Sequence, residues 1–367
     1  MVCIAAFIIL CLVSVIVGFL SIFKRDIGKK YWKVFKKSWG CVGKRVTLQK
    51  CDTNFKDDVK NTILRKVVIK RPKLVKPLSA AIEVVSVLIV LVTVWSIVEG
   101  AKAGLALWTL GTCNVQRPAA CSLSAGIGCS IDGDAGPQNA IEHVQYWFKD
   151  WGEIFGAIPD KFRSWDADQF DFAYITKEAN TGGREKAVDI MDPGCEVCRQ
   201  SFKLQLESGF FDSHDVRVVV FPIKDGEDKY KFANSRIIAS YIYATSMEGQ
   251  PKHAEQYNSA NEPAFEMLSR VFTGNDESGQ SYFEAFGGGE ATLSKYSNEQ
   301  VEVILLDWLQ EFGFGTEQRA SIKERAHSSE IEEKLAKNND IVINDIHAKG
   351  IPTMLYGGRK HSGMFKE

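Results

Sequence analysis

Cys195 and Cys198 are the side chains whose spacing most clearly suggests chemistry. The apolar positions Cys198, Phe202 and Leu206 recur at helical spacing, and Asp192-Pro193-Gly194 is typical of the turn before a helix. Cys195 is therefore predicted at a helix N-terminus, where amide donors and the helix dipole favour a thiolate over a thiol. Cys198 would lie one turn away, close enough to form a disulfide. The spacing predicts reversible thiol–disulfide exchange, with Cys195 as nucleophile and Cys198 as resolving thiol.

A zinc site is the competing interpretation of two cysteines at this spacing. A structural zinc ion needs two more Cys or His ligands at comparable spacing. The chain has no second C-x-x-C, and its six histidines include no close pair. We therefore expect no metal and no cofactor beyond the redox-active disulfide itself.

Seven further cysteines fall into three groups along the chain. The first apolar segment holds Cys3 and Cys11, and the basic segment after it holds Cys41 and Cys51. The remaining three lie in a stretch containing Gly, Ser and Pro: Cys113, Cys121 and Cys129. A structural disulfide among these three and a relay that passes electrons onward are both compatible with the sequence.

The charge of the chain is strongly segregated, although its 367 residues carry a formal net charge of only −1. Residues 1–23 carry no charged side chain, whereas residues 24–77 hold 18 Lys or Arg and only 4 Asp or Glu. The 22 uncharged residues 2–23 suffice to cross a bilayer core of about 30 Å. Because basic residues follow this segment and none precedes it, an uncleaved anchor is favoured over a cleaved signal peptide.

A second membrane span is predicted from Leu78 to Val98, with Glu83 as its single charge. A buried core helix is the alternative, which the uncharged run 84–98 disfavours. Basic residues beside a span are retained in the cytoplasm, so the N-terminus and everything after about Gly100 should be extracytoplasmic. The basic loop would lie against anionic lipid headgroups, and we expect no nucleic acid as partner.

Three strands and one helix must surround the cysteines. A short buried strand, 187–191, precedes them, and a second strand, 216–223, follows their helix. A helix that begins at Ser329, with Glu332 as its capping-box partner, should end at Gly350. Because Pro352 has no N–H to donate to a central ladder, it marks the start of a third strand.

This arrangement resembles the thioredoxin fold, and within it the DsbA-like branch, over about residues 171–363. The resemblance implies an α/β domain with a helical subdomain inserted at about 226–348. Apolar residues at helical spacing over 234–247 and 297–312 agree with such an insert. The second of these has a candidate capping box, Ser297 with Gln300. Residues 357–363 would form the closing hairpin.

The same resemblance assigns residue roles. It implies a cis bond between Ile351 and Pro352, and an extended substrate lying along Ile351, Pro352 and Thr353. It also implies that Asp189, six residues before Cys195, is a buried carboxylate that relays protons for Cys198. A strand-end aspartate facing solvent is the alternative for Asp189.

Two features depart from familiar DsbA-like members. Glu196-Val197 stands between the cysteines, and a carboxylate beside Cys195 opposes its ionisation. Pro193-Gly194, and no aromatic residue, precedes Cys195, which predicts a more open site.

The predicted organisation is two transmembrane helices followed by a thioredoxin-like domain: 1–23 and 78–99 as spans, 24–77 as cytoplasmic loop, 100–169 as juxtamembrane region and 170–367 as DsbA-like domain. The predicted function is membrane-tethered thiol–disulfide exchange with exported protein thiols and with a redox partner in the membrane or envelope. Oxidase, reductase and isomerase activities all fit the sequence. A non-catalytic envelope binding module with a permanent Cys195–Cys198 disulfide is the alternative.

Overall fold

The computed structural model describes residues 75–116, 129–131, 139–178, 183–225, 229–252, 257, 259, 261–289 and 294–366. The predicted first span and residues 24–74 of the predicted basic loop lie outside the described residues. The chain divides into two compact units, residues 1–102 and 103–367.

Helix α4 (Val75–Leu110) is 36 residues long and contains the whole of the predicted span 78–98. Within the described residues, the stretch long and apolar enough to cross a membrane is Leu91–Leu110, which overlaps the second half of the predicted span. Large side chains along it, Leu91, Val94 and Ile97, are more than half exposed. This part of α4 therefore lacks the packing of a core helix.

A four-stranded sheet forms the centre of the second unit, in the order β3-β2-β5-β6. The strands are β2 (Glu185–Met191), β3 (His214–Val220), β5 (Thr353–Tyr356) and β6 (Arg359–Ser362). β2 and β3 are parallel and are connected through α6 (Glu196–Glu207) and α7 (Phe210–Ser213), whereas β5 and β6 are antiparallel additions. This is the thioredoxin-like topology expected from the sequence, including the closing hairpin.

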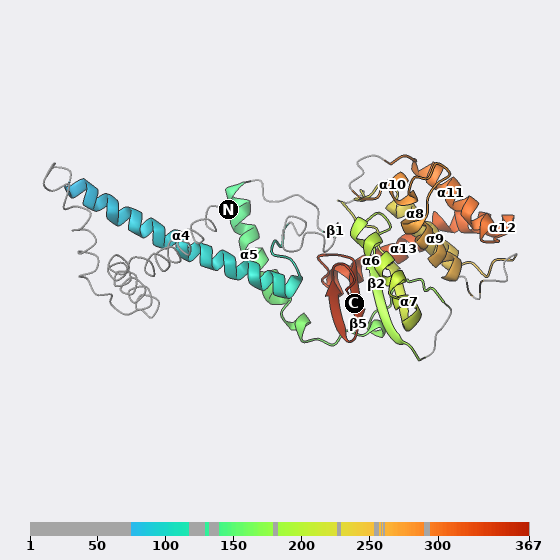
Figure 1. Ribbon diagram of the computed structural model, residues 1–367, viewed down its shortest axis with the longest axis horizontal. Coiled ribbons are helices and arrows are strands. Elements are labelled where there is room, and N and C mark those ends of the chain that lie inside the picture. The colour runs from blue at the N-terminus through green and yellow to red at the C-terminus, as the bar shows by residue number, and fades with distance from the viewer. Residues whose placement is uncertain are drawn as a thin grey trace, which may run out of the picture. The chain divides into compact units, whose positions relative to one another are not determined.

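Among the residues described between β3 and β5, six α-helices form the predicted insert and gather together beside the sheet (Figure 1). They are α8 (Ser235–Ser246), α9 (Asn261–Thr273), α10 (Tyr282–Ala285), α11 (Asn298–Glu311), α12 (Thr316–Ala326) and α13 (Ser329–Asp340). The helices predicted at 234–247 and 297–312 are α8 and α11. The capping box of α11, Ser297 with Gln300, is also confirmed.

The start of α13 at Ser329 is predicted correctly, but its capping box and its end are not. Ser328 is its N-cap and makes no side-chain capping bond, since its hydroxyl donates to the Arg325 carbonyl at 2.7 Å, and Glu332 forms an ion pair with Arg236 of α8. The α-helix ends at Asp340, and a π-helical turn, η5 (Ile341–Asp345), follows it directly. Both end before the predicted stop at Gly350. Tertiary pairing with α8 thus overrides the local capping pattern.

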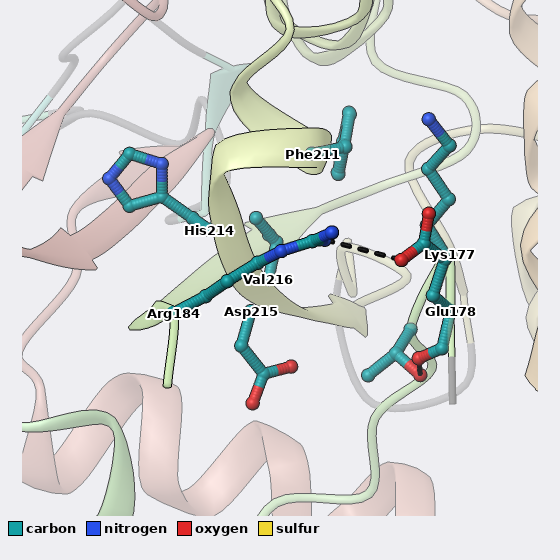
Figure 2. A pocket seen from close by; sticks show the side chains of 8 residues that line it. Lys177, Glu178, Arg184, Phe211, His214, Asp215 and Val216 are labelled. Atoms are coloured by element: carbon teal, nitrogen blue, oxygen red, sulfur yellow. Dashed lines mark hydrogen bonds and ion pairs between the residues drawn. The ribbon is translucent and has the colours of Figure 1, made fainter. Parts of the chain in front are cut away.

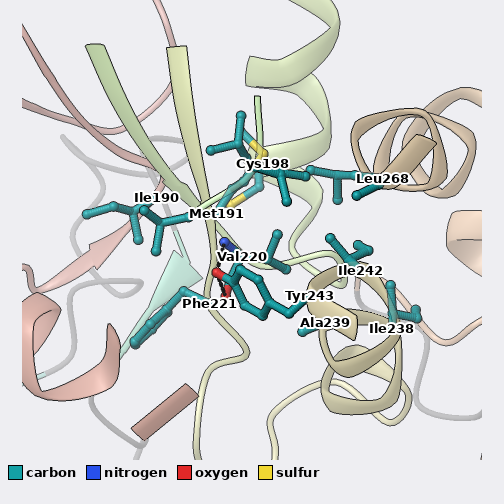
Figure 3. Packing of buried hydrophobic residues seen from close by; sticks show 14 of the residues in the cluster. Ile190, Met191, Cys198, Val220, Phe221, Ile238, Ala239, Ile242, Tyr243 and Leu268 are labelled. Carbon is teal, nitrogen blue, oxygen red and sulfur yellow. Dashed lines mark hydrogen bonds between the residues drawn. The ribbon is translucent and has the colours of Figure 1, made fainter. Parts of the chain in front are cut away.

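One buried hydroxyl joins the insert to the sheet (Figure 3). Tyr243 of α8 accepts a hydrogen bond from the Val220 N–H at 2.8 Å, and its oxygen lies 3.0 Å from the carbonyls of Val220 and Ala173. Asn338 of α13 donates to the same oxygen at 2.9 Å. These bonds fix α8 and α13 against the end of β3.

Replacing Tyr243 by phenylalanine should therefore destabilise the domain by about 1–3 kcal/mol, because the Val220 and Asn338 donors lose a buried acceptor. Urea unfolding of wild type and variant would measure this loss. Tyr174→Phe, at a partly exposed tyrosine, serves as control. An unchanged unfolding midpoint in Tyr243→Phe would contradict the importance of this contact.

The region 100–169 contributes structure of its own. Helix α5 (Ala140–Gly156) is capped by Asn139, whose side chain accepts from the Glu142 N–H, and its Ile154 packs with Ala106 and Val115. Two short 3-10 turns follow, η3 (Pro159–Lys161) and η4 (Ala167–Gln169). A two-residue strand from this region, β1 (Cys129–Ser130), pairs with β4 (Gly350–Ile351).

Candidate active site

Cys195 stands at the junction between β2 and α6. It is the N-cap of α6, and its Sγ accepts a hydrogen bond from the Cys198 N–H at 3.4 Å. The turn before it is closed by a bond of 3.0 Å from the Cys195 N–H to the Asp192 carbonyl. The placement predicted for Cys195 at a helix start is confirmed.

Cys195 is disulfide-bonded to Cys129, which lies 66 residues earlier in the chain. Cys198 is a free, buried thiol. The expected disulfide between Cys195 and Cys198 is therefore not the one present. Cys129 also does not pair within its own group; Cys113 is disulfide-bonded, and Cys121 lies outside the described residues.

The segment that carries Cys129 lies along the residues before Pro352. β1 runs antiparallel to β4, with Cys129 opposite Ile351 and Ser130 opposite Gly350. The Ile131 N–H extends this pairing to the Lys349 carbonyl at 3.2 Å. An extended chain thus occupies the place that the sequence resemblance assigned to substrate, and it comes from the protein itself.

Of the three predicted substrate-binding residues, Ile351 lies beside the disulfide. The Ile351–Pro352 bond is cis, as predicted, and Cys195 Sγ lies 3.9 Å from the Ile351 carbonyl oxygen. Thr353 donates from Oγ1 to the Gly350 carbonyl at 2.7 Å, which fixes the short bend that contains Pro352. The carbonyl of residue 351 and the sulfur of residue 195 therefore face the same extended segment.

Asp189 is fully buried in β2, so the solvent-facing alternative is wrong. Gln205 Nε2 donates to its Oδ2 at 2.6 Å, and among the described residues its Oδ1 has no hydrogen-bond partner. Burial raises the pKa of Asp189 to about 7, because a buried carboxylate loses its hydration. A group with this pKa can exchange protons at neutral pH.

Asp192 is a second buried carboxylate, which sequence reasoning missed. It accepts from the Gly194 N–H at 2.7 Å and the Ile223 N–H at 2.6 Å, and the Ser235 hydroxyl donates to it. Burial raises its pKa to about 6, and these hydrogen bonds oppose the rise. Asp192 thereby holds the turn before Cys195 against α8 and the segment that follows β3. The Asp-Pro-Gly turn was the only sequence signal for this residue.

Cys198 is held as a protonated thiol. Burial among the apolar side chains shown in Figure 3 raises its pKa well above the ordinary value, and the negative charges of Asp192 and Asp189 add to the rise. Its thiol therefore needs a nearby base before it can attack a disulfide.

Glu196 was expected to oppose the ionisation of Cys195. Its carboxylate pairs with Arg199 at 3.4 Å and accepts from Gln200 at 3.0 Å. Arg199 itself is fixed by a hydrogen bond of 3.0 Å to the Phe272 carbonyl and lies over the Phe283 ring. Because the Arg199 cation offsets the charge of Glu196, Glu196 opposes the ionisation of Cys195 less than an unpaired carboxylate would.

The site is closed, so the openness expected from Pro193-Gly194 is wrong. A Cβ on Gly194 would lie 2.4 Å from Phe232 Cβ, which shows how closely Phe232 covers the turn. The Gly194 carbonyl accepts from the Gly289 N–H of the insert at 2.9 Å. Cys195 is fully buried.

Gly194→Ala is accordingly expected to lose about 1–3 kcal/mol of unfolding free energy, because the new methyl overlaps Phe232. Gly152→Ala is the matched control: it lies within α5 with open space around its Cα, and alanine there should stabilise the helix by about 0.5–1 kcal/mol. Urea unfolding of both variants gives the comparison. Equal effects of the two substitutions would disprove the close approach at Gly194.

A polar hollow at the opposite end of the sheet takes no part in this arrangement (Figure 2). It surrounds the first residues of β3, where Arg184 pairs with Glu178 at 3.2 Å. Cys195, in contrast, follows the C-terminal end of β2, so the seven residues of that strand separate it from Arg184.

Comparison with known proteins gives structural similarity alone. No protein-family model and no curated protein matches the chain. Among solved structures, the thiol-disulfide exchange protein alpha-DsbA2 from Wolbachia pipientis is 16% identical, covers 63% of this chain and 94% of its own, and has a TM-score of 0.32. The thiol-disulfide oxidoreductase MdbA from Corynebacterium matruchotii is 13% identical, with coverage of 60% and 95% and a TM-score of 0.36.

DsbA from Chlamydia trachomatis is a third neighbour, 14% identical over 54% of this chain and 84% of its own, with a TM-score of 0.33. These neighbours are the class of protein that the sequence resemblance named. The assignment of a thioredoxin-like α/β fold rests on the sheet order, the N-cap cysteine and the cis proline of this chain.

Proposed function

We propose that this protein is a membrane-tethered, extracytoplasmic thiol–disulfide oxidoreductase that acts on the thiols of exported proteins. The observation that carries the proposal is a cysteine at the start of α6 in disulfide linkage with an extended segment that pairs with Ile351 before Pro352. This is the arrangement that a mixed disulfide with a bound peptide requires.

The residues supply each step of exchange. A substrate thiolate attacks Cys195 of an oxidised Cys195–Cys198 pair, forms a mixed disulfide and displaces Cys198 as a thiolate, which takes a proton. A second substrate thiolate then attacks the substrate sulfur and displaces Cys195, so two electrons pass from the substrate dithiol to the pair. In the reverse direction Cys198 resolves the mixed disulfide, and Asp189 or Asp192 accepts its proton.

Tethering is supported by the apolar stretch Leu91–Leu110 of α4 and by the apolar residues 2–23 on either side of the basic segment 24–77. With the basic segment in the cytoplasm, the cysteine-bearing domain faces the compartment where disulfides persist. The redox partner would be a protein of the membrane or envelope.

A non-catalytic binding module is the second candidate, favoured by the complete burial of Cys195 in its bond to Cys129. In that case the disulfide is structural and resists exchange.

Redox equilibration separates the two candidates. Full-length protein in detergent micelles is equilibrated with glutathione buffers, and the thiols of Cys195 and Cys198 are alkylated and counted by mass. An oxidoreductase should equilibrate with a potential between about −120 mV, expected of a disulfide donor, and about −270 mV, expected of a reductant. If the disulfide remains intact in millimolar glutathione, the oxidoreductase proposal fails and the non-catalytic binding module is the better assignment.

A further inference from the structure

We propose that Cys129 is a third redox cysteine, carried on a built-in substrate segment that closes the site and that Cys198 releases. This inference rests on the proposed function and adds a regulatory step to it. The segment is defined as residues 129–131.

Backbone pairing shows that the segment occupies a place shaped for it. It pairs antiparallel with residues 349–351, and the sulfur of Cys129 is bonded to the sulfur of Cys195. A Cβ at Gly350 would lie 3.0 Å from the Cys129 carbonyl oxygen. Glycine at position 350 allows this close approach. An extended chain can therefore pair with residues 349–351 in the register that places Cys129 next to the sulfur of Cys195.

An apolar side chain fixes the segment independently of the disulfide. Ile131 is 7% exposed and belongs to the main core cluster of the domain, and Cys129 packs partly buried against the same cluster. The segment is therefore held by three kinds of interaction: a covalent bond, backbone hydrogen bonds and burial of Ile131. Another peptide can enter only after these are displaced.

Release requires no external oxidant or reductant. Cys198 loses its proton to a neighbouring carboxylate and attacks Cys195 Sγ; the Cys195–Cys129 bond breaks, and Cys129 leaves as a thiolate that takes a proton. One disulfide and one thiol are present before and after, so no electrons are gained or lost. The Cys198 N–H already lies 3.4 Å from Cys195 Sγ, which places the two residues for this exchange.

The protonation of Cys198 sets the pace of release. Its pKa is raised by burial and by the nearby carboxylates, so at neutral pH the closed form persists. The release step should accelerate as pH rises, because more Cys198 becomes thiolate.

The test uses oxidised full-length protein in detergent. Acid-quenched, non-reducing digestion with mass spectrometry should find the Cys129–Cys195 linkage in wild type and in Cys198→Ser, and the Cys195–Cys198 linkage in Cys129→Ser. Glutathione should form a mixed disulfide with Cys195 roughly tenfold faster in Cys129→Ser than in wild type, because the Cys129–Cys195 bond tethers the segment over Cys195, whereas in the variant only backbone bonds and Ile131 hold it.

Two further variants sharpen the comparison. Ile131→Ala keeps every cysteine and weakens only the docking of the segment, so it should react with glutathione at an intermediate rate. Cys51→Ser removes a thiol from the basic segment and should react like wild type.

Equal glutathione rates in wild type and Cys129→Ser would overturn this inference alone, and so would a wild type that contains only the Cys195–Cys198 linkage. A Cys129→Ser protein that carries the Cys195–Cys198 disulfide and still fails to exchange would overturn the proposed function, and this inference with it.

Discussion

Replacing Cys195 by serine should abolish disulfide exchange, with a loss of roughly 10⁴-fold or more, the scale on which removal of a nucleophile acts in enzymes. A hydroxyl cannot form the mixed disulfide, and no other described thiol lies at a helix start beside residue 351. Turnover of a fluorescent dithiol peptide by full-length protein would measure the loss. Retained turnover would contradict the assignment of Cys195 as the nucleophile.

Cys198→Ser is the informative companion of that variant. In a Cys129→Ser background, which frees Cys195, it keeps the attacking sulfur and removes the resolving one. Reduced Cys195 should therefore attack the disulfide form of the peptide, displace one peptide thiol and stop at the mixed disulfide. Circular dichroism of both variants checks that the fold is intact. Failure of Cys198→Ser to accumulate any mixed disulfide would show that the two cysteines do not divide the roles as proposed.

Asp189→Asn should slow the step in which Cys198 attacks by about 10²-fold, the lower end of what a positioned general base contributes. In wild type the rate should rise as pH passes about 7, where Asp189 ionises. In the variant the inflection near pH 7 should be absent, and only the gradual rise from ionisation of Cys198 should remain. Single-turnover rates between pH 5.5 and 8.5 would show it, and identical pH profiles would exclude Asp189 as the base.

The same substitution should stabilise the fold at high pH. The pKa of Asp189 is 3.8 as a free carboxyl and about 7 when folded, so between these values the unfolded chain releases a proton that the folded chain retains. Stability therefore falls as pH rises from about 4 to about 7, and the cost, about 2–4 kcal/mol, is complete above pH 7.

Asp189→Asn should recover most of that cost at pH 8 and little at pH 4. Urea unfolding at the two pH values, with the disulfide state held constant, measures the difference. Glu207→Gln, which removes an exposed carboxylate from α6, is the control and should change neither value appreciably. A variant less stable than wild type at pH 8 would show that Asp189 is stabilised as a carboxylate.

The sequence predicted those parts of the structure whose signals are local. Periodic apolar residues located α8 and α11, and Ser297 with Gln300 marked the start of α11 correctly. The position of Cys195 followed from the turn before it. The strand that begins after Pro352 followed from the missing amide donor of proline.

Features that depend on distant contacts could not be predicted in this way. Five cysteines after the predicted spans allow several pairings, and only the approach of residues 129–131 to Gly350 selects the bond to Cys195. Ser329 and Glu332 had the spacing of a capping box, yet Arg236 of another helix takes the carboxylate. Asp192 likewise finds its partners, Ile223 and Ser235, only after β3 and α8 have packed.

The position of Cys129 in the chain also links redox state to chain entropy. A bond between residues 66 apart encloses α5 and β2 in one covalent ring. Such a ring restricts the unfolded chain and is worth ~4 kcal/mol in loop-closure terms, whereas a ring between Cys195 and Cys198 restricts it far less. Each transfer of the disulfide from one pair to the other would therefore change the melting temperature of the whole domain, so that the domain becomes easier to unfold whenever its site is free to receive a substrate.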